Sequence, residues 1–292
     1  MASLRLFLPL AALSLVACSG SARTGFENQQ PEQPAPGNTP PPANTGDFDT
    51  NKNPPPPPPP EVNEVFGHSA ATLYRLDPKS NDVTTVGDFS GCGPVIDIAL
   101  DESSNLYATS YEALYTIDKK TAKCTEIGRG SFPNSLSFVP KGTVDAAEEA
   151  LVGYEGSSYV RIDTKTGKKT TLGSIGSGLV SSGDIVSVKG GKTYLTVKGT
   201  SQCDAKDCLV EVDPKTGAMV KNWGSIGYDN VFGISFWGGK IYGFDETGTL
   251  FEVTFSGSSL STKTIPIPSK PSNLSFWGAG SSTSAPLVST PQ

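Results

Sequence analysis

The chain has 292 residues and a formal net charge of −6 at pH 7, and it is rich in Gly (32) and Pro (24). The acidic balance disfavours nucleic acid and anionic surfaces as main partners. The single histidine, His68, argues against serine-hydrolase triads, histidine-rich metal hydrolases and haem attachment. We therefore expect His68 at the margin of a strand, with no part in catalysis.

The N-terminus carries an apolar run, residues 6–17, which is too short to span a membrane and is followed directly by a cysteine. The residues Leu15-Val16-Ala17-Cys18 resemble the lipobox of bacterial lipoproteins. An ordinary cleaved signal peptide is the alternative. The resemblance implies a signal peptide at 1–17 and acyl chains on Cys18 that anchor the protein in a lipid bilayer. Ser19 then favours the outer membrane, facing either the periplasm or the cell surface.

Residues 18–61 join the lipidated cysteine to a segment with too few apolar side chains to form a core. Thirteen of the 24 prolines lie between Pro31 and Pro60, and they end in an unbroken run of seven. Such a run adopts polyproline II, at about 3.1 Å per residue. We expect a disordered Pro-rich tether that holds the next domain away from the lipid surface. A docking site for a proline-binding domain is the alternative.

From residue 62 the sequence changes to short alternating apolar runs separated by turn residues, a pattern typical of β-strands. A hairpin recurs whose first strand ends at Asp, or at Thr in the last copy. The Asp copies continue into turns such as Lys165-Thr166-Gly167. The strand ends are Asp77, Asp118, Asp163, Asp213 and Thr254. Their spacing of 41 to 50 residues is the length of one propeller blade.

A second repeated strand precedes these hairpins and completes four blades, at about 94–128, 133–173, 182–223 and 231–267. The domain's first segment supplies only three strands, and a lone strand around Asn273 to Trp277 is left at the other end. Pairing the two ends gives a fifth blade and removes exposed sheet edges. The sequence thus predicts an all-β, five-bladed β-propeller at 62–278 with a flexible tail at 279–292. A two-sheet sandwich is the alternative. Blade length and turn chemistry resemble the WD40, NHL and YVTN propellers.

Four cysteines remain besides Cys18, namely Cys92, Cys124, Cys203 and Cys208. In an exported protein they suggest two disulfides, for which the count alone allows three pairings. We expect Cys203 with Cys208, which closes a short loop, and Cys92 with Cys124. A zinc site is disfavoured because the spacing is not C-x₂-C and only one histidine is present.

The repeat alignment brings together the residues just before the innermost strands, at the mouth of a propeller's central channel. They are Asp97, Ser135, Asp184, Gly233 and Asn273. Oxygen atoms of Asp97, Asp184 and Asn273 would suit a Ca²⁺ ion, whose ligands lie at about 2.3–2.6 Å. The simpler interpretation is that these groups hydrogen-bond strand ends and channel water. No other cofactor is expected.

The loops between blades emerge on the same face and carry tyrosines beside acidic residues. The predicted binding residues are Tyr111, Glu112, Tyr154, Glu155, Tyr228 and Asp229. Tyrosine rings near Gly and Ser suit recognition of a protein or glycan. Four other aromatic residues are expected to pack between blades, namely Phe236, Trp237, Phe276 and Trp277.

These observations predict a non-enzymatic protein- or glycan-binding or assembly module of the cell envelope. A calcium-dependent, lactonase-like propeller hydrolase is the alternative from the enzyme class, and the scarcity of histidine argues against it. A purely structural envelope component is the third candidate.

Overall fold

The computed structural model describes residues 64–288, which lie in the compact unit Pro58–Gln292. The expected signal peptide, Cys18 and the Pro-rich tether lie outside the described residues. Between residues 64 and 288, no helix is long and apolar enough to cross a membrane.

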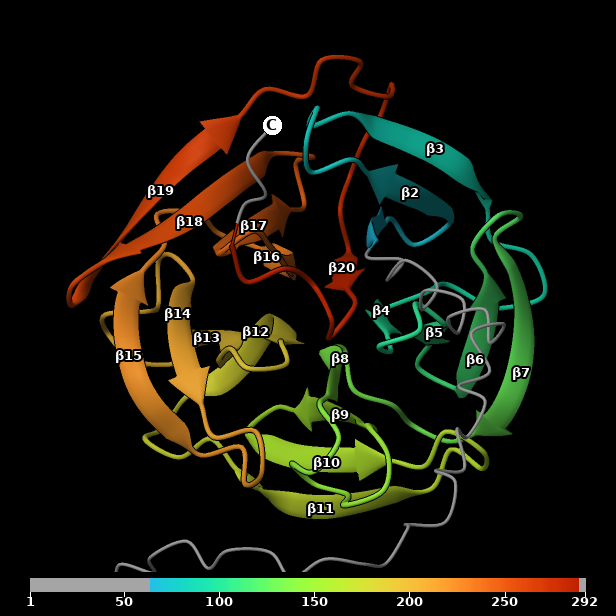
Figure 1. Ribbon diagram of the computed structural model, residues 1–292, viewed down its shortest axis with the longest axis horizontal. Coiled ribbons are helices and arrows are strands. Elements are labelled where there is room, and N and C mark those ends of the chain that lie inside the picture. The colour runs from blue at the N-terminus through green and yellow to red at the C-terminus, as the bar shows by residue number, and fades with distance from the viewer. Residues whose placement is uncertain (1–63, 289–292) are drawn as a thin grey trace, which may run out of the picture. The chain divides into compact units, whose positions relative to one another are not determined.

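The described residues form five four-stranded sheets around a central axis, one sheet per blade (Figure 1). From the axis outward, blade 1 contains β20 (Gly278–Ser281), β1 (Val65–His68), β2 (Thr72–Leu76) and β3 (Val83–Asp88). Blade 2 contains β4 (Asp97–Leu100), β5 (Leu106–Thr109), β6 (Ala113–Asp118) and β7 (Lys123–Arg129). Blade 3 contains β8 (Leu136–Val139), β9 (Ala150–Glu155), β10 (Ser158–Ile162) and β11 (Lys169–Ser174). Blade 4 contains β12 (Val180–Ser187), β13 (Thr193–Lys198), β14 (Cys208–Val212) and β15 (Met219–Ser225). Blade 5 contains β16 (Val231–Trp237), β17 (Lys240–Asp245), β18 (Leu250–Ser256) and β19 (Ser259–Ile265). The predicted five-bladed, all-β propeller is confirmed.

The apolar core is distributed around the ring as clusters that each join two neighbouring blades. Between blades 3 and 4, for example, Val139 and Tyr159 share a cluster with Ile185 and Leu195. The blades therefore present apolar side chains to both of their neighbours, so that each blade buries its faces against the next around the ring. Phe236 and Phe276 are buried in such clusters, as predicted.

Blade 1 closes the ring with strands from both ends of the domain. β20 pairs antiparallel with β1, so that His68 lies opposite Gly278 and Val65 opposite Ser281. This confirms the predicted closure but corrects the strand, which was expected at Asn273 to Trp277. Asn273 instead has a left-handed φ of 61° in the turn before the strand. Gly278 is needed because a Cβ there would lie 2.3 Å from His68 Nε2 and 2.4 Å from Asp97 Oδ1.

The segment after β20 crosses the end of the channel away from the inter-blade loops. Ser282 forms a parallel bridge with Leu100 in blade 2, and Thr283 O accepts the Lys189 N–H in blade 4 at 2.8 Å. Pro286 O accepts the Gly238 N–H in blade 5 at 2.8 Å. The prediction of a flexible tail from residue 279 is thus wrong for β20 and for residues 282–287, because this segment supplies backbone partners to three blades.

Two disulfides confirm the expected cysteine pairs, Cys92 with Cys124 and Cys203 with Cys208. The first links the loop before blade 2 to its outer strand β7, and the second closes the loop between β13 and β14. Disulfides persist in oxidising compartments, so the pair indicates a protein that resides outside the cytoplasm.

Candidate functional site

The channel mouth is encircled by the residues that the strand registers place at equivalent positions in the five blades. They are Asp97, Ser135, Asp184, Gly233 and Gly278, which we call the channel ring. The sequence predicted the first four members. Asn273, the predicted fifth, is exposed in the turn before β20, and Gly278 takes its position.

Asp184 and Asp97 act as hydrogen-bond acceptors at the start of the innermost strands. Asp184 Oδ1 accepts the Ile185 N–H at 2.6 Å, and Oδ2 accepts the Ile234 N–H of blade 5 at 2.8 Å. Asp97 Oδ1 accepts the Ile98 N–H at 2.8 Å. These contacts favour the simpler of the two interpretations, in which ring carboxylates tie strand ends together.

Burial dominates the electrostatics of this pair. Both carboxyl groups are fully buried, and loss of hydration raises the pKa of each well above its usual value. The charge of Asp184 raises the pKa of Asp97 further. Since both oxygens of Asp184 accept backbone N–H groups, we assign the negative charge to Asp184 and a proton to Asp97. In the described part of the chain, residues 64–288, the buried Asp97 Oδ2 and Ser135 hydroxyl have no hydrogen-bond partner.

His68 ends β1 beside the channel ring and is fully buried. Its Nδ1 donates to Ser69 O at 2.9 Å, and Nε2 lies 3.9 Å from Asp97 Oδ1 without a hydrogen bond. Burial lowers the pKa of His68 to about 4, so the imidazole is neutral at pH 7. It lies in the interior of the ring, out of contact with solvent.

The expected calcium ligands are only partly brought together. Asp97 and Asp184 are neighbours, whereas Asn273 is exposed outside the channel ring. Ca²⁺ takes six to eight oxygen ligands, and both oxygens of Asp184 already accept N–H groups. Among residues 64–288 no group of three or more His, Cys, Asp or Glu side chains is placed to hold a metal ion.

An open pocket of about 290 Å³ is lined mainly by residues that directly precede the channel-ring residues in sequence. We call it the mouth pocket, and its lining residues are Ile96, Tyr111, Asn134, Phe232, Glu246 and Trp277. Four of them immediately precede channel-ring residues in blades 2, 3, 5 and 1. Tyr111 comes from the β5–β6 loop and Glu246 from the β17–β18 loop. The pocket therefore collects side chains from four blades.

Two large aromatic side chains are exposed to solvent at the mouth pocket. Tyr111 is 70% exposed and Trp277 is 38% exposed, while the backbone of Trp277 is fixed by its N–H to His68 O at 2.7 Å. Glu246 is also exposed, and Asn230 Nδ2 donates to its Oε2 at 3.1 Å. Exposed aromatic residues grouped around a hollow mark interaction sites in soluble proteins.

The predicted binding residues differ in how far their side chains are exposed to solvent. Tyr111, Glu112 and Asp229 are exposed as expected. Glu155 is half-buried and paired with Lys169. Tyr228 is half-buried and stacks on the ring of Phe251, with its centroid 3.9 Å away. Tyr111 and Glu112 remain available for binding, whereas Glu155 and Tyr228 are largely engaged within the fold and Asp229 is paired with Lys198 at 2.7 Å.

Tyr154 is a correction, because it is fully buried in β9 and its hydroxyl donates to Gly217 O at 2.7 Å. Trp277 is the opposite correction, since it was expected between blades and instead lines the mouth pocket. Sequence reasoning also missed Phe232, Glu246 and Asn134. The available signal was position, because Phe232, Asn134 and Trp277 each precede a channel-ring residue.

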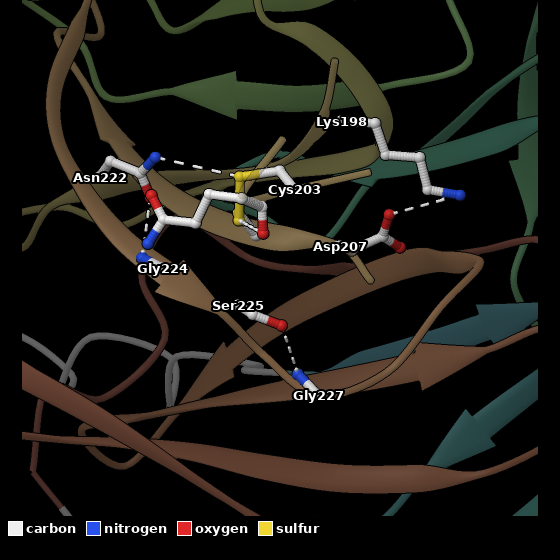
Figure 2. The surroundings of a disulfide bond; sticks show 9 residues. Lys198, Cys203, Asp207, Asn222, Gly224, Ser225 and Gly227 are labelled. Atoms are coloured by element: carbon white, nitrogen blue, oxygen red, sulfur yellow. Dashed lines mark hydrogen bonds and ion pairs between the residues drawn. A yellow bond between two sulfur atoms is a disulfide. The ribbon is translucent and has the colours of Figure 1, made fainter. Parts of the chain in front are cut away.

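The loop closed by Cys203 and Cys208 carries a buried carboxylate, Asp207, which Figure 2 shows facing Lys198. Asp207 Oδ2 accepts the Val231 N–H at 2.7 Å, and Oδ1 lies 3.6 Å from Lys198 Nζ. Lys198 also pairs with Asp229 at 2.7 Å. Burial raises the pKa of Asp207, against the opposing effects of the Val231 N–H and Lys198. This loop is thus held rigidly beside the mouth face.

No protein-family model and no curated protein matches the chain. Among solved structures, the nidogen/laminin complex is similar with a TM-score of 0.48 and 13% identity, over 78% of this chain and 100% of that chain. A protein of unknown function from Bacteroides caccae gives 0.42 and 8%, over 75% and 98% of the two chains. BamB from Moraxella catarrhalis gives 0.33 and 9%, over 65% and 68%. At these identities the likeness concerns the fold alone.

Proposed function

We propose that this protein is a non-enzymatic recognition or assembly module of the cell envelope, which binds a protein or glycan through the mouth pocket and the loops around it. The observation that carries the proposal is the gathering of exposed Tyr111 and Trp277 at one end of the channel. In this proposal acylated Cys18 anchors the protein in the outer membrane, and the Pro-rich tether lets the mouth pocket reach its partner.

The asymmetry of the two channel ends supports this choice of face. The segment 282–287 lies across one end and contacts blades 2, 4 and 5. The other end carries the mouth pocket and the inter-blade loops. A partner that reaches the channel therefore meets the aromatic side chains first.

The buried centre of the ring supports a binding function over hydrolysis. His68 and Asp97 are fully buried, and Asp184 accepts two backbone N–H groups. A general base must come within hydrogen-bond reach of the proton it removes. Burial keeps His68 and Asp97 away from solvent, and the hydrogen bonds of Asp184 hold strand ends together.

Affinity capture from an envelope extract tests the proposal with the mature protein and a variant that carries Tyr111→Ala and Trp277→Ala. Partners retained by the wild type and lost from this variant support recognition through the mouth pocket. Val220→Ala is the control, because Val220 is 61% exposed on the outer strand β15. Equal retention by all three forms contradicts the proposal and favours a purely structural component.

A further inference from the structure

We infer that the mouth pocket binds a cationic side chain, the ammonium group of a lysine presented by a protein partner. This inference rests on the proposed function, and it names the chemistry that the pocket recognises. Three steps carry it: the aromatic lining, the sign of the charge and the size of the pocket.

The lining is half aromatic. Tyr111, Phe232 and Trp277 enter the pocket from three different blades. The negative face of an aromatic ring attracts a cation, most strongly for Trp, with about 0.5 to 2 kcal/mol per contact. Rings contributed by separate blades surround a small cation from several directions, whereas a single exposed ring does not.

The charge of the pocket is negative. Glu246 is the one charged side chain among its lining residues, and the lining contains no Lys, Arg or His. Lys198 lies nearby, with Nζ 3.4 Å from Asn230 Oδ1, but it is already paired with Asp229 and Asp207. Within residues 64–288 no Lys or Arg forms an ion pair with Glu246, and in this inference an incoming ammonium group supplies the cation.

The neighbouring surface has the same sign. Tyr111 also lines an adjacent pocket that contains Glu112, Glu126 and Arg129. Arg129 is held by Glu126 through two hydrogen bonds of 2.9 and 3.1 Å and also interacts with the charge of Glu112, so the two glutamates outnumber the one arginine and this pocket keeps a net negative charge. Acidic groups at the rim attract a basic segment and raise its rate of association.

The volume of the mouth pocket favours a single side chain over an oligosaccharide as its ligand. Pockets for drug-sized ligands measure about 300 to 1,000 Å³. The mouth pocket, at about 290 Å³, lies at the lower end of that range. It has room for the stem and head of one lysine, while the acidic rim contacts the rest of a basic peptide.

Isothermal titration calorimetry with the mature protein tests the inference. The probe is the tripeptide acetyl-Gly-Lys-Gly-amide, and the matched neutral probe replaces lysine with norleucine. Butylammonium reports on a free amine without a peptide, and N-acetylglucosamine reports on a neutral sugar. We expect saturable binding of the lysine peptide and binding at least about tenfold weaker for the norleucine peptide, since a charged hydrogen bond contributes about 1.5–3 kcal/mol.

Two variants keep the test independent of folding. Glu246→Gln removes only the charge and should weaken lysine-peptide binding about tenfold, whereas Glu148→Gln, an exposed glutamate outside the mouth pocket, should leave it unchanged. Tyr111→Leu removes an aromatic face but keeps an apolar side chain at a 70% exposed position.

The outcomes separate the inference from the proposed function. Equal affinity for the lysine and norleucine peptides, or no effect of Glu246→Gln, overturns the cationic assignment. Tight binding of butylammonium without added affinity for the peptide overturns the assignment to a protein partner. Sugar binding that is lost in Tyr111→Leu and kept in Glu246→Gln also overturns the inference, yet it supports recognition through the same pocket. No binding of any probe, together with unchanged capture by the mouth variants, contradicts both.

Discussion

Asp184 in blade 4 accepts the backbone N–H of Ile234 in blade 5, with 2.8 Å between Oδ2 and the nitrogen. Its other oxygen accepts the Ile185 N–H at the start of its own strand. A single buried carboxylate thus joins two innermost strands of different blades. Apolar contacts between blades are non-directional, whereas this hydrogen bond favours one alignment of the two strands, together with the bond from the Val231 N–H to Asp207.

Asp184→Asn should destabilise the propeller by about 1–3 kcal/mol, because an amide offers one acceptor oxygen and leaves one buried N–H facing its NH₂ group. Urea denaturation at pH 7, with the disulfides intact, measures the change in the free energy of unfolding. Asp204→Asn, at an exposed position of the Cys203–Cys208 loop, is the control. Equal midpoints for the Asp184→Asn and Asp204→Asn variants would show that the bridge does not stabilise the ring.

The raised pKa of Asp97 makes stability depend on pH. The folded protein keeps the Asp97 proton at pH values where the unfolded chain has released it. The contribution of this group to stability is therefore complete below the ordinary Asp pKa. It is lost as pH rises through the folded-state pKa, at up to about 1.4 kcal/mol per pH unit. Asp97→Asn mimics the protonated form and should flatten this dependence.

Urea midpoints between pH 4 and 9 check this expectation, because the window begins at the ordinary Asp pKa and the titration of His68 contributes equally to wild type and variant. The facing titratable groups are Asp184 and His68, and both are unchanged in the variant. Parallel curves for wild type and Asp97→Asn would mean that Asp97 is ionised in the folded protein.

His68 should titrate with a pKa of about 4 in the folded protein, because burial disfavours the imidazolium. Its contribution to stability is complete above the ordinary His pKa and is lost as pH falls toward 4, reaching about 3 kcal/mol. Proton NMR measures the midpoint directly, since the chain contains a single histidine. A midpoint near 6.5 would show that water reaches the ring interior.

The blade repeat could be predicted from sequence because strand-ending Asp residues and turn glycines are local signals. The closing strand β20 could not be predicted, because residues 274–277 resemble the innermost strand of blade 5 in sequence. The strand that closes the ring contains two glycines, which have weak strand propensity. Gly278 is required by crowding from His68 and Asp97, a contact that only the folded ring creates.

The candidate site was predicted less well than the fold. Tyr111 and Tyr154 have similar sequence surroundings, yet Tyr111 lies in a loop and Tyr154 lies in β9, opposite Tyr159. The two tyrosines therefore occupy different positions along their hairpins. A small displacement along a hairpin exchanges a solvent-facing side chain for a core-facing one. The mouth pocket combines residues from four blades, so it becomes visible only once the ring is assembled.

The two disulfides should contribute unequally. Cys92 and Cys124 are 32 residues apart, whereas Cys203 and Cys208 are 5 residues apart. The chain-entropy model assigns about 4 kcal/mol to the longer loop and about 2 kcal/mol to the shorter one. Chemical denaturation of the two double-Ala variants measures the difference. A larger loss for the shorter loop would point to packing around the buried Cys203 and Cys208 rather than loop closure as the main contribution.

Deletion of residues 282–292 should lower the melting temperature, because it removes the parallel bridge to Leu100 and the carbonyl groups of Thr283 and Pro286, which accept the N–H groups of Lys189 and Gly238. Deletion of residues 289–292 is the matched control, since it keeps every contact of segment 282–287. Each lost backbone hydrogen bond contributes about 0.5–1.5 kcal/mol, so the longer deletion should cost a few kcal/mol in total. Differential scanning calorimetry compares the two truncations with the full mature chain. If both truncations have the same melting temperature as the full chain, the contacts of segment 282–287 add nothing to the stability of the ring, and pairing of β20 with β1 is sufficient to close it.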